Sequence, residues 1–306
     1  MNKDTPTSEN SSEKGYIVKR PFGETGDMLS VLGFGSIVLI LNEQKTANMI
    51  VAEAVESGIN YFDVAPSYGD NFGLRGDAEI KLGPALHPYR KDCFLACKTG
   101  MRSRKEAEIE FNLSLQRLQT DYFDLYQLHG ITDVQTDVDQ AFMKGGVMEM
   151  LIEKKREGKI RNLGFSAHST AAARTAMDRY NFDSVMFAVN YACWYKGGYG
   201  PEIMQKAIET NTARLALKAL AKQRRSPAYP ETSFPKCWYE PLTEREQAAR
   251  ALRWTLSQPI TAAVSPGDEK LYKMALSIVR EGIDLHDDDV QRVKDDALLA
   301  NPIFPQ

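Results

Sequence analysis

The sequence predicts an α/β fold, a (β/α)8 barrel of the TIM type, from its length and from the order of its predicted elements. Eight short apolar segments alternate with amphipathic helical segments over roughly 250 residues, the usual size of such a barrel. The strand segments are apolar almost throughout, as expected for parallel strands that are buried on both faces. The alternative, an open doubly wound sheet, usually has fewer units and a glycine-rich first turn, so we favour the barrel.

A β-hairpin is predicted ahead of the barrel, because segments 16–18 and 29–32 flank a turn with glycine at both ends, residues 23–26. The predicted barrel strands lie at residues 31–34, 61–64, 94–97, 123–128, 162–166, 185–189, 215–217 and 261–264. The first helix shows the spacing i, i+3, i+4, i+7 over residues 47–54 and ends at Gly58. The later helices are predicted at residues 78–86, around 111–118, and at 147–156, 171–179, 202–210, 244–256 and 270–279.

The chain is expected to form a single domain with one flexible end. Residues 1–15 are polar, and they carry too little apolar surface to offset the entropy of ordering them. We therefore expect a flexible tail over residues 1–15 and one (β/α)8 barrel domain over residues 16–306. A last amphipathic helix, residues 287–299, is expected to pack on the outside of this barrel.

Composition excludes several classes of protein. The 306 residues include 38 Lys and Arg against 41 Asp and Glu, so the net charge of −3 argues against a nucleic-acid partner. The longest apolar run, residues 37–41, is far shorter than the ~18 residues of a membrane span. The polar N-terminus lacks the apolar core of a signal peptide, and the four cysteines form neither a disulfide framework nor a zinc set. We expect a cytoplasmic protein that binds no metal and no membrane.

Polar side chains mark the ends of three consecutive predicted strands. Asp63 lies near the end of the second strand and is followed by Tyr68, whereas Lys98 ends the third strand and His129 the fourth. Because such barrels place their active sites at the carboxyl ends of the strands, these four side chains are expected to converge. An ammonium next to a phenol stabilises the phenolate, and a neighbouring carboxylate keeps the ammonium charged and in place. The set therefore predicts a general acid that protonates an oxyanion forming on a carbonyl group, which a neutral imidazole would orient.

Two longer runs carry a resemblance to a known family. Residues 58–69 (GINYFDVAPSYG) and 124–129 (DLYQLH) resemble signatures of the aldo-keto reductase superfamily, and the similarity extends from about Tyr16 to about Leu276. The resemblance implies hydride transfer between NAD(P)H and an aldehyde or a ketone without a metal, with the dinucleotide extended across the barrel mouth. It also implies that Tyr68 is the general acid in a catalytic tetrad of Asp63, Tyr68, Lys98 and His129.

The same resemblance implies where the cofactor binds. Ser166 matches the serine of the family's Ser-Asn pair, whose asparagine is absent here, so His168 is expected to take part of its role. Asn190 lies where the family usually has glutamine, Tyr191 is expected to stack on the nicotinamide ring, and Lys218 to contact phosphate. The complete set of expected cofactor contacts is Gly35, Ser36, Asp63, Ser166, His168, Asn190, Tyr191, Lys218, Ser265, Gly267 and Lys273.

The segment expected to bind the adenine end departs from the family pattern. Residues 265–267 (SPG) resemble the family's turn, but Asp268 and Glu269 follow it, and anions repel the 2′-phosphate of NADPH. Lys273 aligns with the phosphate-binding arginine of the family. Lys273 thus favours NADPH, whereas the two acidic residues favour NADH. We expect NADPH as the cofactor, and we keep NADH as the alternative.

The first functional hypothesis is a carbonyl reductase for a small-molecule substrate, acting as a monomer or a small homo-oligomer. Aromatic residues in the loops after the sixth and seventh strands suggest a polar ring such as a sugar, and they are Trp194, Tyr195, Tyr199, Trp238 and Tyr239. One alternative is a redox-sensing regulatory subunit that binds nicotinamide nucleotide with little turnover. Another is an isomerase or aldolase, which would need a base or a Schiff-base lysine of its own. The basic cluster 222–225 is expected to form a solvated loop, and the alternative is that it helps to hold the phosphate of the cofactor.

Overall fold

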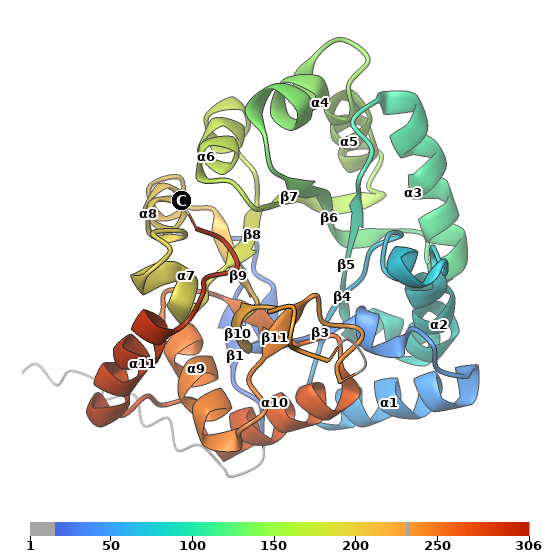
Figure 1. Ribbon diagram of the computed structural model, residues 1–306. Helices are drawn as coiled ribbons and strands as arrows, with labels where there is room; N and C mark the ends of the chain where they lie inside the picture. The colour runs from blue at the N-terminus through green and yellow to red at the C-terminus, as the bar shows by residue number, and fades with distance from the viewer. Residues whose placement is uncertain (1–15, 231–232, 306) are drawn as a thin grey trace, which may run out of the picture.

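A computed structural model describes residues 16–230 and 233–305, and in this part of the chain eight parallel strands close into a barrel (Figure 1). The strands are β3 (Leu32–Gly35), β4 (Tyr61–Asp63), β5 (Phe94–Thr99), β6 (Phe123–Ile131), β7 (Ile160–Ala167), β8 (Ser184–Ala188), β9 (Ala213–Leu217) and β12 (Ala262–Val264). Their order around the barrel follows the sequence, with β12 between β9 and β3. The predicted fold class is therefore confirmed. The expected flexible tail, residues 1–15, lies outside the described residues and stays a prediction.

Helices surround the barrel on the outside (Figure 1). They are α1 (Gln44–Glu56), α2 (Asp77–Leu86), α3 (Arg104–Leu118), α4 (Gln140–Phe142), α5 (Val147–Arg156), α6 (Thr170–Arg179), α7 (Tyr191–Tyr195), α8 (Pro201–Glu209), α9 (Arg245–Ser257), α10 (Glu269–Glu281) and α11 (Asp287–Leu299). Short turns of 3₁₀-helix lie at Ser36–Leu39, Asp70–Phe72 and His87–Asp92, and a π-helical turn lies at Val134–Asp139. The predicted periodicity is confirmed in α1, which buries Ala47, Ile50, Val51 and Ala54. The predicted last helix is α11, and it packs outside the barrel against α7 and α9.

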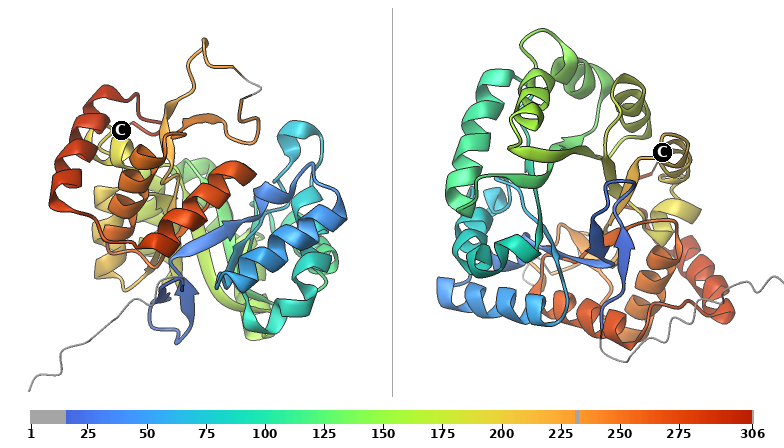
Figure 2. Two further views of the ribbon diagram at one scale, coloured as in Figure 1. Left: turned by 90° about the horizontal axis from the view of Figure 1, so that it is seen from below. Right: turned by 180° about the vertical axis from the view of Figure 1, so that it is seen from behind.

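The N-terminal hairpin closes the bottom of the barrel. Its strands β1 (Lys19–Pro21) and β2 (Met28–Ser30) pair antiparallel. Strand β1 begins three residues after the start of the predicted strand, residues 16–18. Phe22 and Leu29 are fully buried in one cluster with the barrel-interior residues Tyr61 and Phe94. Figure 2 shows this hairpin, in blue, at the end of the barrel opposite the orange segment that contains β10 and β11.

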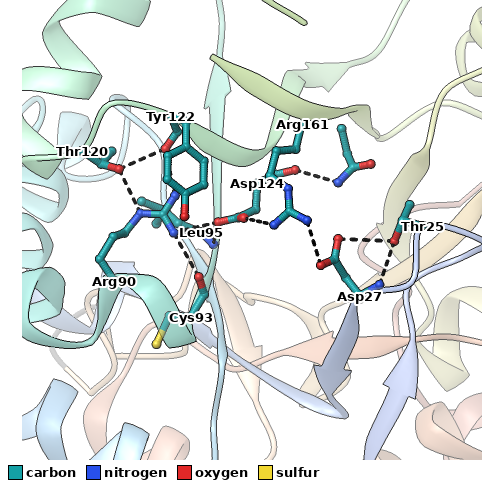
Figure 3. A network of polar contacts seen from close by, with 10 residues as sticks. Thr25, Asp27, Arg90, Cys93, Leu95, Thr120, Tyr122, Asp124 and Arg161 are labelled. Carbon is teal, nitrogen blue, oxygen red and sulfur yellow. Dashed lines mark hydrogen bonds and ion pairs between the residues drawn. The ribbon is translucent and has the colours of Figure 1, made fainter. Parts of the chain in front are cut away.

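Asp124 is the centre of a polar network that joins this hairpin to the barrel (Figure 3). Its carboxylate is almost fully buried and accepts hydrogen bonds from Arg90 and Arg161, each at 2.8 Å. Arg161 also donates to Asp27 of the hairpin turn at 3.2 Å. Asp124 begins the second family-like run, and the network gives it a structural role at the barrel bottom, far along β6 from His129.

The basic cluster 222–225 forms part of a second hairpin, which corrects the expectation of a solvated loop. Strands β10 (Ala221–Arg224) and β11 (Tyr239–Pro241) pair antiparallel in front of the barrel mouth (Figure 1). Lys222 pairs with Glu240 across the strands at 2.9 Å, and the Arg224 guanidinium donates to the carbonyl of Pro302 at 3.0 Å. These partners lie 18 and 78 positions away, so a local pattern does not reveal them. No helix within residues 16–230 and 233–305 is long and apolar enough to span a membrane.

Candidate active site

A cavity of about 400 Å³ lies at the carboxyl ends of the barrel strands, between the strand tips and the β10–β11 hairpin. This volume is within the range of small-molecule sites, about 300–1,000 Å³. Tyr68, Lys98 and His129 line the cavity, and Asp63 lies directly beneath them. Among the described residues, no aspartate or glutamate lines it. The cavity is therefore rich in cations and poor in anions.

Asp63, Lys98 and Tyr68 form a closed set of contacts, as predicted. Adjacent parallel strands β4 and β5 carry Asp63 and Lys98, and their side chains are almost inaccessible to solvent at 0% and 1% exposure. The Lys98 ammonium forms a short ion pair with Oδ2 of Asp63 and donates to the Tyr68 hydroxyl at 3.0 Å. The Tyr68 hydroxyl donates in turn to Oδ2 of Asp63 at 3.0 Å. One carboxylate oxygen thus holds both the amine and the phenol.

The electrostatic effect on Tyr68 is opposite to the expected one. Burial raises the pKa of Tyr68 well above its usual value, and the charge of Asp63 and the hydrogen bond to it raise this pKa further. We expected Lys98 to make the phenol more acidic, but burial and the adjacent carboxylate outweigh the ammonium. The phenol therefore keeps its proton at neutral pH, ready to transfer it to an anion that forms beside it.

His129 lies at the tip of β6 as a neutral imidazole. Burial lowers its pKa well below the usual value, and the positive charge of Lys98 lowers this pKa further. The ring packs edge-on against the Tyr68 ring, with centroids 5.9 Å apart. Its Nδ1 atom lies 3.2 Å from the Ser67 hydroxyl. The sequence interpretation did not give Ser67 a role, although its position next to Tyr68 was a signal.

Arg102 holds the strand tip that carries His129. Its guanidinium donates to the His129 carbonyl at 2.9 Å and to the Asp137 carboxylate at 3.0 Å. Arg102 lies in the loop after β5, so this contact ties the tips of two neighbouring strands together. The contact fixes the backbone of His129 and so the point from which its ring extends.

Six of the expected cofactor contacts line the cavity, and they are Gly35, Ser166, His168, Lys218, Ser265 and Gly267. Two of them accept no side chain. A Cβ on Gly35 would lie 2.8 Å from the Ser265 carbonyl oxygen, and a Cβ on Gly267 would lie 2.4 Å from the Ile37 side chain. Ser36 is buried next to Gly35, and its hydroxyl has no hydrogen-bond partner within the described residues.

Lys218 and His168 line the cavity, and within the described residues neither the Lys218 ammonium nor Nδ1 of His168 has a hydrogen-bond partner. Lys218 contacts the faces of Trp238 and Tyr239 at 5.4 and 5.1 Å, and burial lowers its pKa to about 8. His168 stacks on Phe304 with centroids 4.7 Å apart, and burial together with Lys218 lowers its pKa to about 4. Within the part of the chain that is described, Nδ1 of His168 has no hydrogen-bond partner. A cation without a carboxylate and a buried imidazole nitrogen fit a dinucleotide, which carries phosphates and an amide.

Asn190 and Tyr191 do not reach this cavity. The Asn190 amide donates to the carbonyls of Lys218 at 3.0 Å and Ala221 at 2.7 Å, and its oxygen caps α7. Tyr191 is buried and lines a separate, smaller cavity on the α11 side. In this structure Asn190 makes structural contacts, because the chain enters α7 directly at this point. Asn190 holds the backbone of Lys218, whose φ of +64° lies in the left-handed region.

Lys273 also lies outside the cavity lining. It is half exposed on α10 and pairs with Glu269 at 2.9 Å. The Asp268 carboxylate caps α10, because it accepts hydrogen bonds from the amides of Lys270 and Leu271 at 2.9 and 3.3 Å. Its negative charge is therefore engaged at the start of the helix. The two acidic residues of this segment therefore have partners within the helix that they begin.

The aromatic residues separate into two groups. Trp194 and Tyr195 pack on Trp254, and Tyr199 packs on Phe304. Trp238 and Tyr239 line the cavity, where Trp238 is 48% exposed. Of the five aromatic residues expected to form the walls of the substrate site, only Trp238 and Tyr239 line the cavity.

Comparison with known proteins gives a consistent result. The sequence model of the aldo/keto reductase family matches residues 32–232. The chain is 27% identical over 287 residues to the uncharacterized oxidoreductase YqkF of Bacillus subtilis, covering 85% of this chain and 90% of that protein. It is 30% identical over 194 residues to L-galactose dehydrogenase of Arabidopsis thaliana, covering 58% and 57%. The structure of aldo-keto reductase AKR11C1 from Bacillus halodurans in its holo form matches with a TM-score of 0.70 at 25% identity, covering 92% and 96%.

Proposed function

The chain belongs to the aldo/keto reductase family of oxidoreductases, and from this premise we propose that it reduces an aldehyde or a ketone to an alcohol with NAD(P)H. The observation that carries the proposal is the contact set of Asp63, Lys98 and Tyr68 at the floor of the cavity. A protonated phenol held by an ammonium and a carboxylate is suited to protonate an alkoxide as it forms. His129 completes the proposed tetrad.

Bound NAD(P)H supplies the hydride in this family. The Tyr68 hydroxyl donates a hydrogen bond to the carbonyl oxygen of the substrate and transfers its proton as negative charge develops there. Lys98, 3.0 Å from the phenol oxygen, stabilises the phenolate that is left, and Asp63 holds Lys98 in place. The neutral ring of His129 orients the same carbonyl oxygen. In the oxidation of an alcohol, the phenolate takes the proton back.

The cavity residues have proposed roles in holding the dinucleotide. Lys218 contacts phosphate, and Ser166 with His168 hold the carboxamide. Gly35 and Gly267 line the cavity with backbone alone, and a Cβ at either position would collide with Ser265 or Ile37. Ser36, Ser265 and Asp63 complete the proposed set near the nicotinamide ribose. The absence of carboxylates from the described lining supports this assignment, since a dinucleotide is anionic.

The preference for NADPH over NADH remains a prediction that depends on Lys273. A 2′-phosphate has to compete with Glu269, which already pairs with this lysine at 2.9 Å. Separate titrations with NADPH and NADH, followed by tryptophan fluorescence, test the preference. Tighter binding of NADPH that is weakened by Lys273→Ala supports it. Tighter binding of NADH contradicts it.

Turnover of a panel of carbonyl compounds tests the proposed activity. We expect the full-length protein to consume NADPH or NADH with aldehydes or ketones, and we expect Tyr68→Phe to abolish turnover while nucleotide binding is retained. Tyr180→Phe is the matched control, because Tyr180 packs on Phe182 outside the cavity. More than a few per cent of wild-type turnover in Tyr68→Phe would refute Tyr68 as the acid. Tight nucleotide binding without turnover of any carbonyl would instead support a redox-sensing subunit.

A sugar or another polar ring is the proposed substrate class. Trp238 supports it, because this residue lines the cavity and is about half exposed, and aromatic faces stack on the apolar faces of sugars. The panel therefore includes aldoses next to simple aliphatic and aryl aldehydes. If simple aldehydes are turned over best and carbohydrates not at all, the substrate class is wrong while the reaction type stands.

A further inference from the structure

The Ser67 hydroxyl is the one side-chain hydrogen-bond partner of the His129 ring within the described residues. Its Oγ lies 3.2 Å from Nδ1 of the imidazole, across a sequence separation of 62. The second ring nitrogen, Nε2, has no partner in the described part of the chain, and the ring lines the cavity. One nitrogen of His129 is thus committed to the protein, and the other is available to a ligand.

The loop that carries Ser67 is held in one conformation on both sides. Pro66 precedes Ser67, and its ring restricts the backbone there. The amide of Tyr68 donates to the Ala65 carbonyl at 3.0 Å, and the amide of Asp70 donates to the Ser67 carbonyl at 3.0 Å. Ser67 and Tyr68 are neighbours in this turn, so the same loop places one side chain on His129 and the next on Lys98.

A neutral imidazole carries one proton, and its environment decides which nitrogen holds it. Burial and the charges of Lys98, Arg102 and Lys218 lower the pKa of His129, so the ring is neutral at pH 7. The Ser67 hydroxyl also carries one proton, and Nδ1 is the one acceptor within hydrogen-bond distance of it in the described residues. Either tautomer leaves one polar hydrogen without an acceptor in the described residues, the Nε2 proton when Ser67 donates to Nδ1 and the Ser67 hydroxyl proton when Nδ1 donates to Ser67. The cavity decides between them, because a carbonyl oxygen beside Tyr68 accepts a hydrogen bond from a protonated Nε2, whereas an unprotonated Nε2 would face that oxygen with a lone pair.

We propose that Ser67 is a positioning residue that donates its hydroxyl proton to Nδ1 of His129 and so holds the ring in the Nε2–H tautomer. His129 then presents a donor to the cavity, next to the Tyr68 hydroxyl. This inference rests on the proposed function, because the group that accepts both hydrogen bonds is the carbonyl oxygen of the substrate. Two donors to one oxygen polarise the carbonyl and stabilise the charge that develops on it.

The tautomer can be measured without any turnover. Long-range ¹H–¹⁵N spectra of the ¹⁵N-labelled full-length protein at pH 7 report which imidazole nitrogen is protonated, and His129→Gln identifies the signal among the four histidines. We expect a protonated Nε2 and an unprotonated Nδ1. A proton on Nδ1 in the wild-type protein would overturn the proposal, whatever the activity of the enzyme.

Two variants test whether the hydroxyl sets the tautomer. We expect Ser67→Ala to give a mixture of tautomers and to lower kcat/KM for carbonyl reduction about tenfold, the effect of one lost hydrogen bond to the reacting group. Its nucleotide affinity should be unchanged, and Ser67→Thr, which keeps the hydroxyl, should retain the Nε2–H tautomer and most of the rate. Ser103→Ala is the matched control, because that hydroxyl caps α3 outside the cavity. An unchanged tautomer in Ser67→Ala would overturn the assignment even if the rate falls.

Discussion

The buried ion pair between Asp63 and Lys98 gives the sharpest prediction for this protein. Both side chains are almost fully excluded from solvent, and no other carboxylate lines the described cavity to replace Asp63. Lys98→Met removes the cation and leaves the Asp63 carboxylate with the Tyr68 hydroxyl as its hydrogen-bond donor. Breaking a buried pair by removing one partner typically costs ~3–5 kcal/mol, because the remaining charge is buried and uncompensated.

The two possible single substitutions should not behave independently. We expect Lys98→Met and Asp63→Asn each to lower the free energy of unfolding by about 3 kcal/mol, the lower end of that range, because Tyr68 still contacts the remaining group. In the double variant neither charge remains, so the loss should be only about 1 kcal/mol. The coupling energy from the double-mutant cycle is then several kcal/mol. Lys98→Met and the double variant should lose at least about 100-fold in kcat, since the phenolate has lost its counter-charge. Asp63→Asn should also lower kcat, because the carboxylate that holds the Lys98 ammonium and the Tyr68 hydroxyl is gone.

Urea unfolding followed by circular dichroism measures these free energies, and carbonyl reduction measures the activity. Arg174→Met is the control, because Arg174 pairs with Glu202 and both side chains are more than half exposed, where an ion pair contributes at most about 1 kcal/mol. If the free energy of unfolding of Lys98→Met lies within about 0.5 kcal/mol of the wild-type value, the buried Asp63 carboxylate does not need Lys98 as its partner. If the double variant loses as much free energy of unfolding as the two single variants together, the two charges do not stabilise each other.

Three further predictions follow from other contacts. Nucleotide affinity should fall as the pH rises through about 8, because Lys218 loses its proton there. In fluorescence titrations, Lys218→Met should weaken nucleotide binding about tenfold at pH 7 and should remove this pH dependence. Asn190→Ala should destabilise the protein by about 2 kcal/mol and also weaken nucleotide binding, since its amide holds the Lys218 carbonyl; unchanged binding would contradict this link. Asp124→Asn should lower the free energy of unfolding by ~3 kcal/mol, because Arg90 loses its buried partner, while kcat stays at the wild-type value; a loss of kcat in the folded variant would argue against a purely structural network.

Much of the fold follows from local patterns. Helix α5 spans residues 147–156 and α11 residues 287–299, the bounds predicted from apolar spacing. The apolar strands were also found at their predicted places within a few residues. These elements depend on interactions between neighbours in the chain, which periodicity reports directly. The β10–β11 hairpin was missed, because its strands are short and its partners lie at the C-terminal segment and across the barrel mouth.

The candidate tetrad was predictable for a geometric reason. Asp63, Lys98 and His129 each end or nearly end a strand, and parallel strands of a closed barrel present all such ends at one rim. The sequence alone therefore determined which residue types gather there. It did not determine the acidity of Tyr68, because the shift of its pKa depends on how deeply the phenol is buried and on which carboxylate oxygen it meets.

Side-chain direction was decided by the tertiary structure. Asn190 was expected at the nicotinamide but holds the Lys218 carbonyl, and Ser67, which had no assigned role, meets His129. Each of these contacts joins residues 28 to 62 positions apart and depends on the backbone angles of the intervening turns. A sequence pattern places a residue on a strand tip or a loop. Only the packed chain sets the direction of its hydrogen bonds, because a change of one backbone angle turns the same side chain toward a different partner.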